Sequence, residues 1–222
     1  TCALPIFHDA AQRFNIYAAL SNVSNRLRGS TIYGIFEKNE MILLATSGGI
    51  IAYNRTRNSF YNVISNHELK NIPLRFRYIN EEGDNKWWVT SDYGMFELVK
   101  KNNLLTLSRP PELPRNFTKQ SIRLYKKRNN ILWVATTDSG LVRYNMSSRH
   151  TTRFKHDPDN PGSLQEDRIN IIEFDKDGNL MVGHDNGFSI LRKDSTNFEN
   201  YPYMNGKKNT ISEARRIRFI RP

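Results

Sequence analysis

The chain has 222 residues and a formal net charge of +11 at pH 7, from 33 lysines and arginines against 22 aspartates and glutamates. Its single cysteine, Cys2, excludes an internal disulfide, and no apolar run approaches the length needed to span a membrane. The positive charge favours anionic partners, such as nucleic acid, an acidic polysaccharide or a membrane surface. A basic surface without any partner is the alternative.

The chain repeats one sequence pattern four times. Residues 14–20 have the pattern of an outer strand from an incomplete unit, and the copies follow at 41–53, 86–98, 131–144 and 179–191. One large apolar residue anchors each copy, and the four anchors, 45, 45 and 48 residues apart, are Leu43, Trp88, Trp133 and Met181. The run 216–221 then has the pattern of a first strand of a further unit. A period in this range is typical of architectures built from repeated supersecondary units.

Within a repeat, short apolar runs alternate with turns rich in Gly, Asn and Asp. In the last repeat these runs are 169–174, 180–183, 188–191 and 198–201. Their lengths and tight turns indicate an antiparallel meander, and no stretch sustains a helical period. A lone four-stranded sheet cannot bury both faces, whereas sheets stacked around an axis can, which favours a β-propeller. A parallel solenoid is less favoured, because its coils lack tight hairpins.

The predicted fold class is therefore all-β, a β-propeller segment of about four four-stranded antiparallel blades with partial blades at both ends. The predicted repeats are approximately 32–75, 76–121, 122–168 and 169–215, and the terminal part-blades are 14–31 and 216–222. Part-blades would expose apolar faces and strand edges. We expect them to pack against the remaining blades of the same protein or against a second copy.

The segment before the last repeat has a distinctive composition. His156-Asp-Pro-Asp-Asn-Pro-Gly-Ser-Leu164 is followed, after four residues, by Ile169-Asn-Ile-Ile-Glu-Phe-Asp-Lys-Asp-Gly-Asn-Leu180. This pattern resembles the two-component regulator propeller repeat, with departures at Leu43 and Met181, which replace a tryptophan, and a double glycine at Gly48–Gly49 alone. The resemblance implies the periplasmic sensor region of a Bacteroidetes hybrid two-component system, which detects breakdown products of complex glycans. Any histidine kinase would lie outside this chain.

Three tryptophans invite a sugar-stacking interpretation, because an aromatic face matches the apolar face of a pyranose. Trp88 and Trp133 occupy the anchor position and are predicted to pack between blades. Trp87 is out of phase with the anchors, and an interface with the neighbouring blade and a ligand-binding surface are equally favoured for it.

Arginine recurs at the second position of the first strand in three of five units. The openers are Ile32, Phe76, Ile122, Ile169 and Ile217, and the residues that follow them are Tyr33, Arg77, Arg123, Asn170 and Arg218. Since the first strand of a propeller blade is innermost, the residues that follow the openers would form an arc around one mouth of the central channel. Together with Trp87, they are the candidate ligand-binding residues. Guanidinium forks suit a uronate- or sulfate-bearing oligosaccharide, and the alternative is that the stems pack between blades with their heads in solvent.

The sequence contains no pattern typical of catalysis or metal binding. Asp175–Asn179 is interpreted as a hairpin turn, because the twelfth position of a calcium loop would fall on Asn186 in place of a glutamate. The five histidines lack zinc-ligand spacing, and no nucleophile motif or phosphate-binding loop occurs. We therefore expect no enzyme activity, no metal and no cofactor.

The sequence predicts a non-catalytic periplasmic sensor segment that binds an oligosaccharide and couples it to signalling. Two alternatives remain, a propeller scaffold for protein–protein interaction and a propeller enzyme similar to a lyase or a sialidase. Nucleic acid is disfavoured, because no basic patch interleaves with aromatic residues on an element built for base contact. A membrane would be involved only through segments outside this chain.

Overall fold

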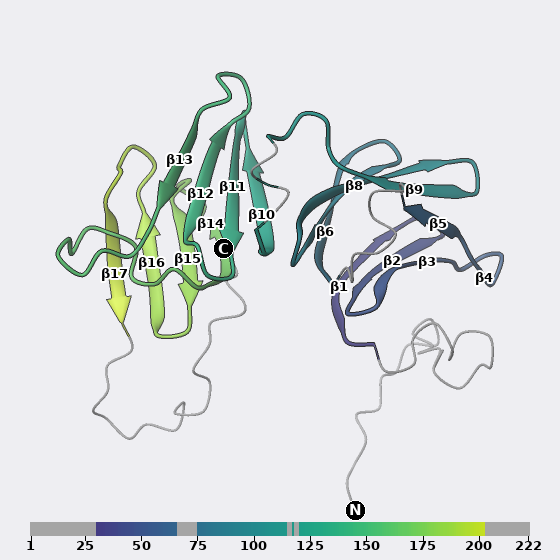
Figure 1. Cartoon of the computed structure of the whole chain (residues 1–222), viewed down its shortest axis with the longest axis horizontal. Helices are drawn as coiled ribbons and strands as arrows, with labels where there is room; N and C mark the ends of the chain where they lie inside the picture. The colour runs from purple at the N-terminus through teal and green to yellow at the C-terminus, as the bar shows by residue number, and fades with distance from the viewer. Residues whose placement is uncertain (1–29, 66–74, 115–116, 118–119, 203–222) are drawn as a thin grey trace, which may run out of the picture. The chain divides into compact units, whose positions relative to one another are not determined.

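The computed structural model describes residues 30–65, 75–114, 117 and 120–202 (Figure 1). The predicted part-blade 216–222, with Arg218, and residues 14–29 of the other part-blade lie outside these ranges. All the sheets belong to one compact unit that begins at Ile32. No helix in the described part of the chain is long and apolar enough to cross a membrane.

Four sheets follow one another along the chain, and in each of them consecutive strands pair antiparallel. The first contains β1 (Ile32–Lys38), β2 (Met41–Thr46), β3 (Gly49–Asn54) and β4 (Ser59–Phe60). The second contains β6 (Phe76–Gly83), β7 (Lys86–Ser91), β8 (Gly94–Lys101) and β9 (Leu104–Ser108). The third contains β10 (Ile122–Arg128), β11 (Ile131–Thr136), β12 (Leu141–Asn145) and β13 (Thr151–Phe154). The fourth contains β14 (Ile169–Phe174), β15 (Leu180–His184), β16 (Gly187–Leu191) and β17 (Phe198–Pro202). These sheets are propeller blades, so the predicted fold class is confirmed.

Asparagine makes the first hairpin turn of three of the four sheets. Asn39, Asn85 and Asn129 have φ values of 53°, 56° and 53°, in the left-handed region that asparagine tolerates better than most side chains. In the fourth sheet the turn is Asp175–Asn179, as predicted, and Gly178 has a φ of 90°. The Asp175 carboxylate accepts hydrogen bonds from the backbone N–H groups of Asp177 and Asn179 at 3.0 and 2.8 Å, so this acidic residue closes the turn.

One strand departs from the expected four-stranded plan. The fourth strand of the first sheet, β4, has only two residues, and the chain then leaves that sheet at the buried Tyr61. The next strand, β5 (Asn62–Ser65), pairs in parallel with β9, so the second sheet has five strands. Backbone hydrogen bonds therefore join the first repeat to the second.

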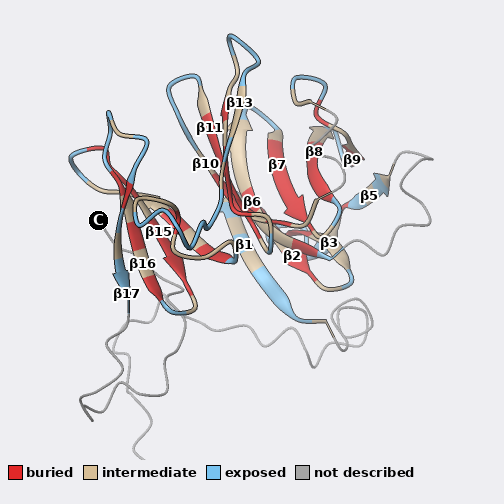
Figure 2. Cartoon of the chain, turned by 60° about the vertical axis from the view of Figure 1, so that its left-hand side comes forward, coloured by how far each residue is buried: buried red, intermediate tan, exposed pale blue. Residues whose placement is uncertain are grey.

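The core lies between successive sheets, where one apolar cluster fills each interface. Figure 2 shows this burial along β7, β8 and β11, in contrast to the pale β1 at the start of the array. Trp88 packs between the second and third sheets and Trp133 between the third and fourth, as predicted. Leu43, the first anchor, is fully buried between the first and second sheets.

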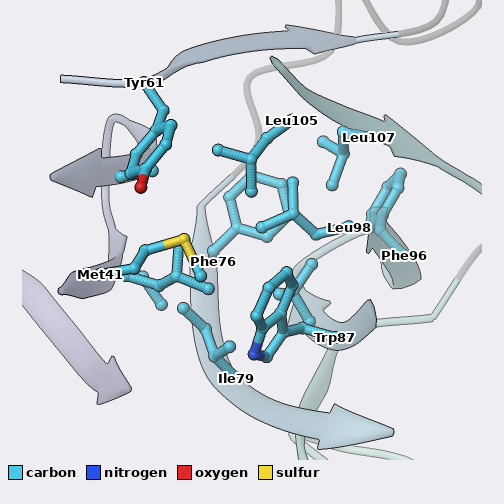
Figure 3. Packing of buried hydrophobic residues seen from close by; sticks show 13 residues of the cluster. Met41, Tyr61, Phe76, Ile79, Trp87, Phe96, Leu98, Leu105 and Leu107 are labelled. Atoms are coloured by element: carbon cyan, nitrogen blue, oxygen red, sulfur yellow. The ribbon is translucent and has the colours of Figure 1, made fainter. Parts of the chain in front are cut away.

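Trp87 also belongs to an interface. Its side chain is 1% exposed and lies among Phe76, Ile79 and Met41, at the interface with the first sheet (Figure 3). The Phe36 ring contacts it edge-on at 6.1 Å. The interpretation of Trp87 as a sugar-binding surface is therefore wrong, because consecutive strand residues point to opposite faces and this blade has a neighbour on each face.

Ion pairs between first strands cross every interface between the sheets. Lys38 pairs with Glu81 across the first interface, Lys127 with Glu82 at 3.0 Å across the second, and Lys126 with Glu173 at 2.5 Å across the third. Tyr125 also donates a hydrogen bond to Glu82 at 2.6 Å, and that carboxylate is 6% exposed. These pairs connect the inner strands in chain order.

The outward faces of the first and last sheets carry apolar side chains that no described sheet covers. Ile35 of β1 is 69% exposed. In the last sheet, Phe188 stacks on Tyr201 with ring centroids 4.8 Å apart, and Met181, at the anchor position, is only half-buried. That further blades or a second copy pack against these faces stays a prediction.

Candidate functional site

The four described residues of the predicted arc lie on adjacent inner strands. Tyr33 is on β1, Arg77 on β6, Arg123 on β10 and Asn170 on β14. The strands contact one another in this order, β1 with β6, β6 with β10, and β10 with β14. These positions therefore lie at the same register on neighbouring blades. Whether they bind a ligand stays a prediction.

Arg77 is already engaged within the protein. Its Nε and Nη2 lie 2.7 and 2.6 Å from Oδ1 of Asp92, which follows β7 in the same sheet. The guanidinium also lies over the Tyr33 ring, 5.5 Å from the centroid. Ser121, from the segment that leads into the third sheet, donates a hydrogen bond to the same Asp92 oxygen at 3.1 Å. Arg77 thus holds neighbouring sheets together and has fewer donors left for a ligand.

The fourth sheet repeats this arrangement with an amide. Asn170 donates a hydrogen bond to Oδ1 of Asp185 at 2.7 Å, and Arg168 lies 3.6 Å from the other carboxylate oxygen. Asp185 stands four residues after the anchor Met181, as Asp92 stands four residues after Trp88. These partners were not predicted from the sequence, although an aspartate at the same register in two repeats was a visible signal.

Arg123 contributes a main-chain contact between sheets. Its carbonyl oxygen accepts a hydrogen bond from the Thr90 hydroxyl at 2.9 Å. Arg77 and Asn170 are thus paired with aspartates, and Tyr33, Arg77 and Arg123 take part in contacts between neighbouring sheets.

A buried histidine lies at the same end of the fourth sheet. His184 is fully buried, and its Nε2 is 3.0 Å from Oγ of Ser189. The Ser189 hydroxyl donates to Oδ1 of Asn200 at 2.6 Å, so the Nε2–H of a neutral imidazole donates to Ser189. Burial lowers the pKa of His184 to about 4, and the Asp185 carboxylate opposes this effect. The imidazole is a neutral structural group at pH 7.

A cavity of about 510 Å³ opens between the third and fourth sheets. It lies beside the β10–β11 and β14–β15 turns, whereas the predicted arc lies at the starts of the first strands. Its lining includes Arg128, Trp133, Arg143 and Phe174. None of these was predicted as a ligand contact. The residues that the structure describes contain no group of three or more His, Cys, Asp or Glu that could hold a metal ion.

Comparisons with known proteins relate this chain to bacterial signalling proteins. No protein-family model matches it. A histidine kinase of Formosa agariphila, Histidine kinase P4, is 28% identical over 176 residues, which cover 74% of this chain and 12% of that protein.

Two solved structures share the fold. The extracellular domain of the hybrid two-component system BT4673 of B. thetaiotaomicron superposes with a TM-score of 0.62 at 19% identity, over 81% of this chain and 23% of that domain. The corresponding domain of BT3049 has a TM-score of 0.58 at 20% identity, over 76% of this chain and 23% of that domain. The chain thus spans less than a quarter of each of these three proteins. The repeated pattern, the propeller fold and the relationship to a histidine kinase confirm the resemblance of this chain to the propeller repeats of two-component regulators.

Proposed function

We propose that the chain is a segment of the periplasmic sensor region of a hybrid two-component regulator and binds an oligosaccharide without altering it. The observation that carries this proposal is the blade array shared with extracellular domains of two hybrid two-component systems. The relationship to a histidine kinase points to the same class of protein. Signalling by the whole regulator would involve parts outside this chain.

The interfaces between blades offer a route by which ligand binding affects the rest of the sensor. Each interface combines an apolar cluster with an ion pair between first strands. A ligand that contacts two blades favours one arrangement of that interface over others, and this difference in affinity is what shifts a conformational equilibrium. The uncovered apolar faces around Ile35 and Tyr201 are proposed to continue the array against further blades or a second copy.

Thermal unfolding of the chain with a panel of neutral and acidic oligosaccharides tests ligand binding. A ligand that binds only the folded state at one hundred times its Kd stabilises that state by about 2.7 kcal/mol, so a clear rise in Tm is expected for at least one panel member. If the arc contributes, Arg123→Lys weakens the interaction although it keeps the charge, because the bidentate fork is lost. An unchanged Tm across the whole panel would contradict oligosaccharide binding and leave the protein-interaction scaffold as the better interpretation.

A further inference from the structure

The cavity between the third and fourth sheets has the size of a small-ligand site. Its volume of about 510 Å³ falls within the range of roughly 300–1,000 Å³ that is usual for such sites. Ile131, Phe154 and Leu180 contribute apolar surface to it, and Thr152 and Thr196 contribute hydroxyl groups. This combination suits a ligand with an apolar face and a hydroxyl-bearing rim.

Arg143 brings an uncompensated charge into this cavity. It is the cross-strand neighbour of the anchor Trp133, and the equivalent neighbours in the other sheets are Ala52, Glu97 and Ile190. Glu97 is neutralised by Lys86 at 2.5 Å. Arg143 makes no ion pair with any described residue, and its guanidinium lies over the Trp133 ring, 5.9 Å from the centroid. A part-buried guanidinium without a counter-ion favours an anion beside it.

Arg128 supplies a second guanidinium to the same cavity. It lies over the Phe174 ring at 5.1 Å from the centroid, and it too makes no ion pair within the described ranges. The Arg128 guanidinium lies close to the backbone of Gly178, since a Cβ there would come within 2.9 Å of its Nη1. The glycine therefore leaves room for the guanidinium, and the aromatic ring fixes the plane of its donors.

The remaining charges leave the cavity positive. Arg192 is neutralised by Glu199, with two nitrogen–oxygen distances of 2.8 and 2.7 Å. Lys193 and Asp194 also line the cavity, and Asp194 is the one acidic residue among its lining residues. Among the described residues, neither Arg128 nor Arg143 forms an ion pair with Asp194 or with another carboxylate.

We infer that this cavity binds a sugar residue that bears a carboxylate or sulfate group, with Arg128 and Arg143 as the anion contacts. This inference rests on the proposed oligosaccharide binding and assigns it a place and a ligand chemistry. The apolar surface packs against the C–H face of the pyranose, and the threonine hydroxyls pair with its hydroxyl groups. Because the ligand contacts the third and fourth sheets together, binding holds these two blades in one arrangement.

Isothermal titration calorimetry with the 222-residue chain tests the assignment. The ligands are a galacturonate trimer, a sulfated galactose oligosaccharide, neutral galactotriose and sodium sulfate. We expect at least one acidic oligosaccharide to bind more tightly than galactotriose and sulfate. Arg128→Gln and Arg143→Gln should each weaken that binding roughly ten-fold, as expected for the loss of a charge-assisted hydrogen bond. Arg57→Gln is the matched control, because it removes one exposed guanidinium whose partner is Asn103.

The outcomes separate this inference from the proposed function. Binding that weakens in Arg123→Gln but not in Arg128→Gln or Arg143→Gln would overturn the cavity assignment and leave oligosaccharide binding intact. An absence of binding by the unaltered chain would overturn both. Equal affinity for sodium sulfate and the sulfated sugar would overturn recognition of the sugar. Arg128→Lys, checked for folding by circular dichroism, provides a second variant in which loss of the fork should still weaken binding.

Discussion

Replacement of Trp133 by alanine is expected to lower the free energy of unfolding by about 3–5 kcal/mol, the usual effect of deleting a buried large aromatic side chain. The ring is 9% exposed, stacks on Phe154 at 5.9 Å and packs in the cluster between the third and fourth sheets. Its loss would leave a void that strand residues on both sides cannot fill without moving. Urea denaturation monitored by circular dichroism measures the effect.

Two further variants make this test specific. Trp133→Phe retains part of the aromatic contact and should cost less than the alanine variant. Trp87→Ala should cost a similar 3–5 kcal/mol, because Trp87 is buried at a different interface. A loss below about 1 kcal/mol for Trp133→Ala would show that its ring is not part of the packing and would restore it as a sugar-stacking surface.

Acidification from pH 7 to pH 5 is expected to remove about 2 kcal/mol of stability through His184 alone. Its pKa is about 4 in the folded chain, because burial disfavours the charged imidazole. In the unfolded chain the ordinary value of 6.5 applies. The unfolded state therefore binds a proton in this pH window and the folded state does not, so stability falls as the pH decreases from 6.5 towards 4 and levels off below that.

Urea denaturation at the two pH values, with the wild-type chain and His184→Gln, isolates this contribution. The variant lacks the titrating group, so its stability should decline by about 2 kcal/mol less than that of the wild type. The same decline in both proteins would mean that His184 is protonated in the folded chain or that its burial is incomplete.

The positions of the strands were predictable, because each strand is determined by residues that lie close together in the chain. Alternation of apolar residues and the asparagine or glycine turns define the hairpins, and the openers Ile32, Phe76, Ile122 and Ile169 each begin a first strand. The pairing of β5 with the second sheet, in place of the first, was not predictable in this way. The run Asn62-Val-Ile-Ser65 is a short β-prone segment that could pair with either sheet edge, and only tertiary structure decides between the two.

The contacts of the candidate site were harder to predict from the sequence, because they join side chains that lie far apart in the chain. The repeat register brought out Arg77 and Arg123, but it said nothing of the carboxylate that pairs with Arg77 fifteen residues later. Arg143 escaped notice for the opposite reason, since its equivalents Ala52, Glu97 and Ile190 show no repeated chemistry at this position. A basic residue opposite the anchor, at a position that is apolar in two of the other repeats, is the signal that could have identified it.

Because β5 pairs within the second sheet, the interfaces between successive sheets are held together by different kinds of contact. The first two repeats share a parallel pair of strands, from Asn62 opposite Leu104 to Ser65 opposite Leu107. The third and fourth sheets share no described strand pair, and they are joined by side-chain contacts and by the loop between them, in which the Asp167 carbonyl accepts a hydrogen bond from the Gly140 N–H at 2.9 Å. Separation of the first pair must break backbone hydrogen bonds, so these two repeats should unfold as one cooperative unit. Native-state hydrogen exchange should accordingly show a common opening free energy for amides of β5, β8 and β9, and a lower one for β17. We therefore expect the first two sheets to separate less readily than the third and fourth, between which the cavity lies.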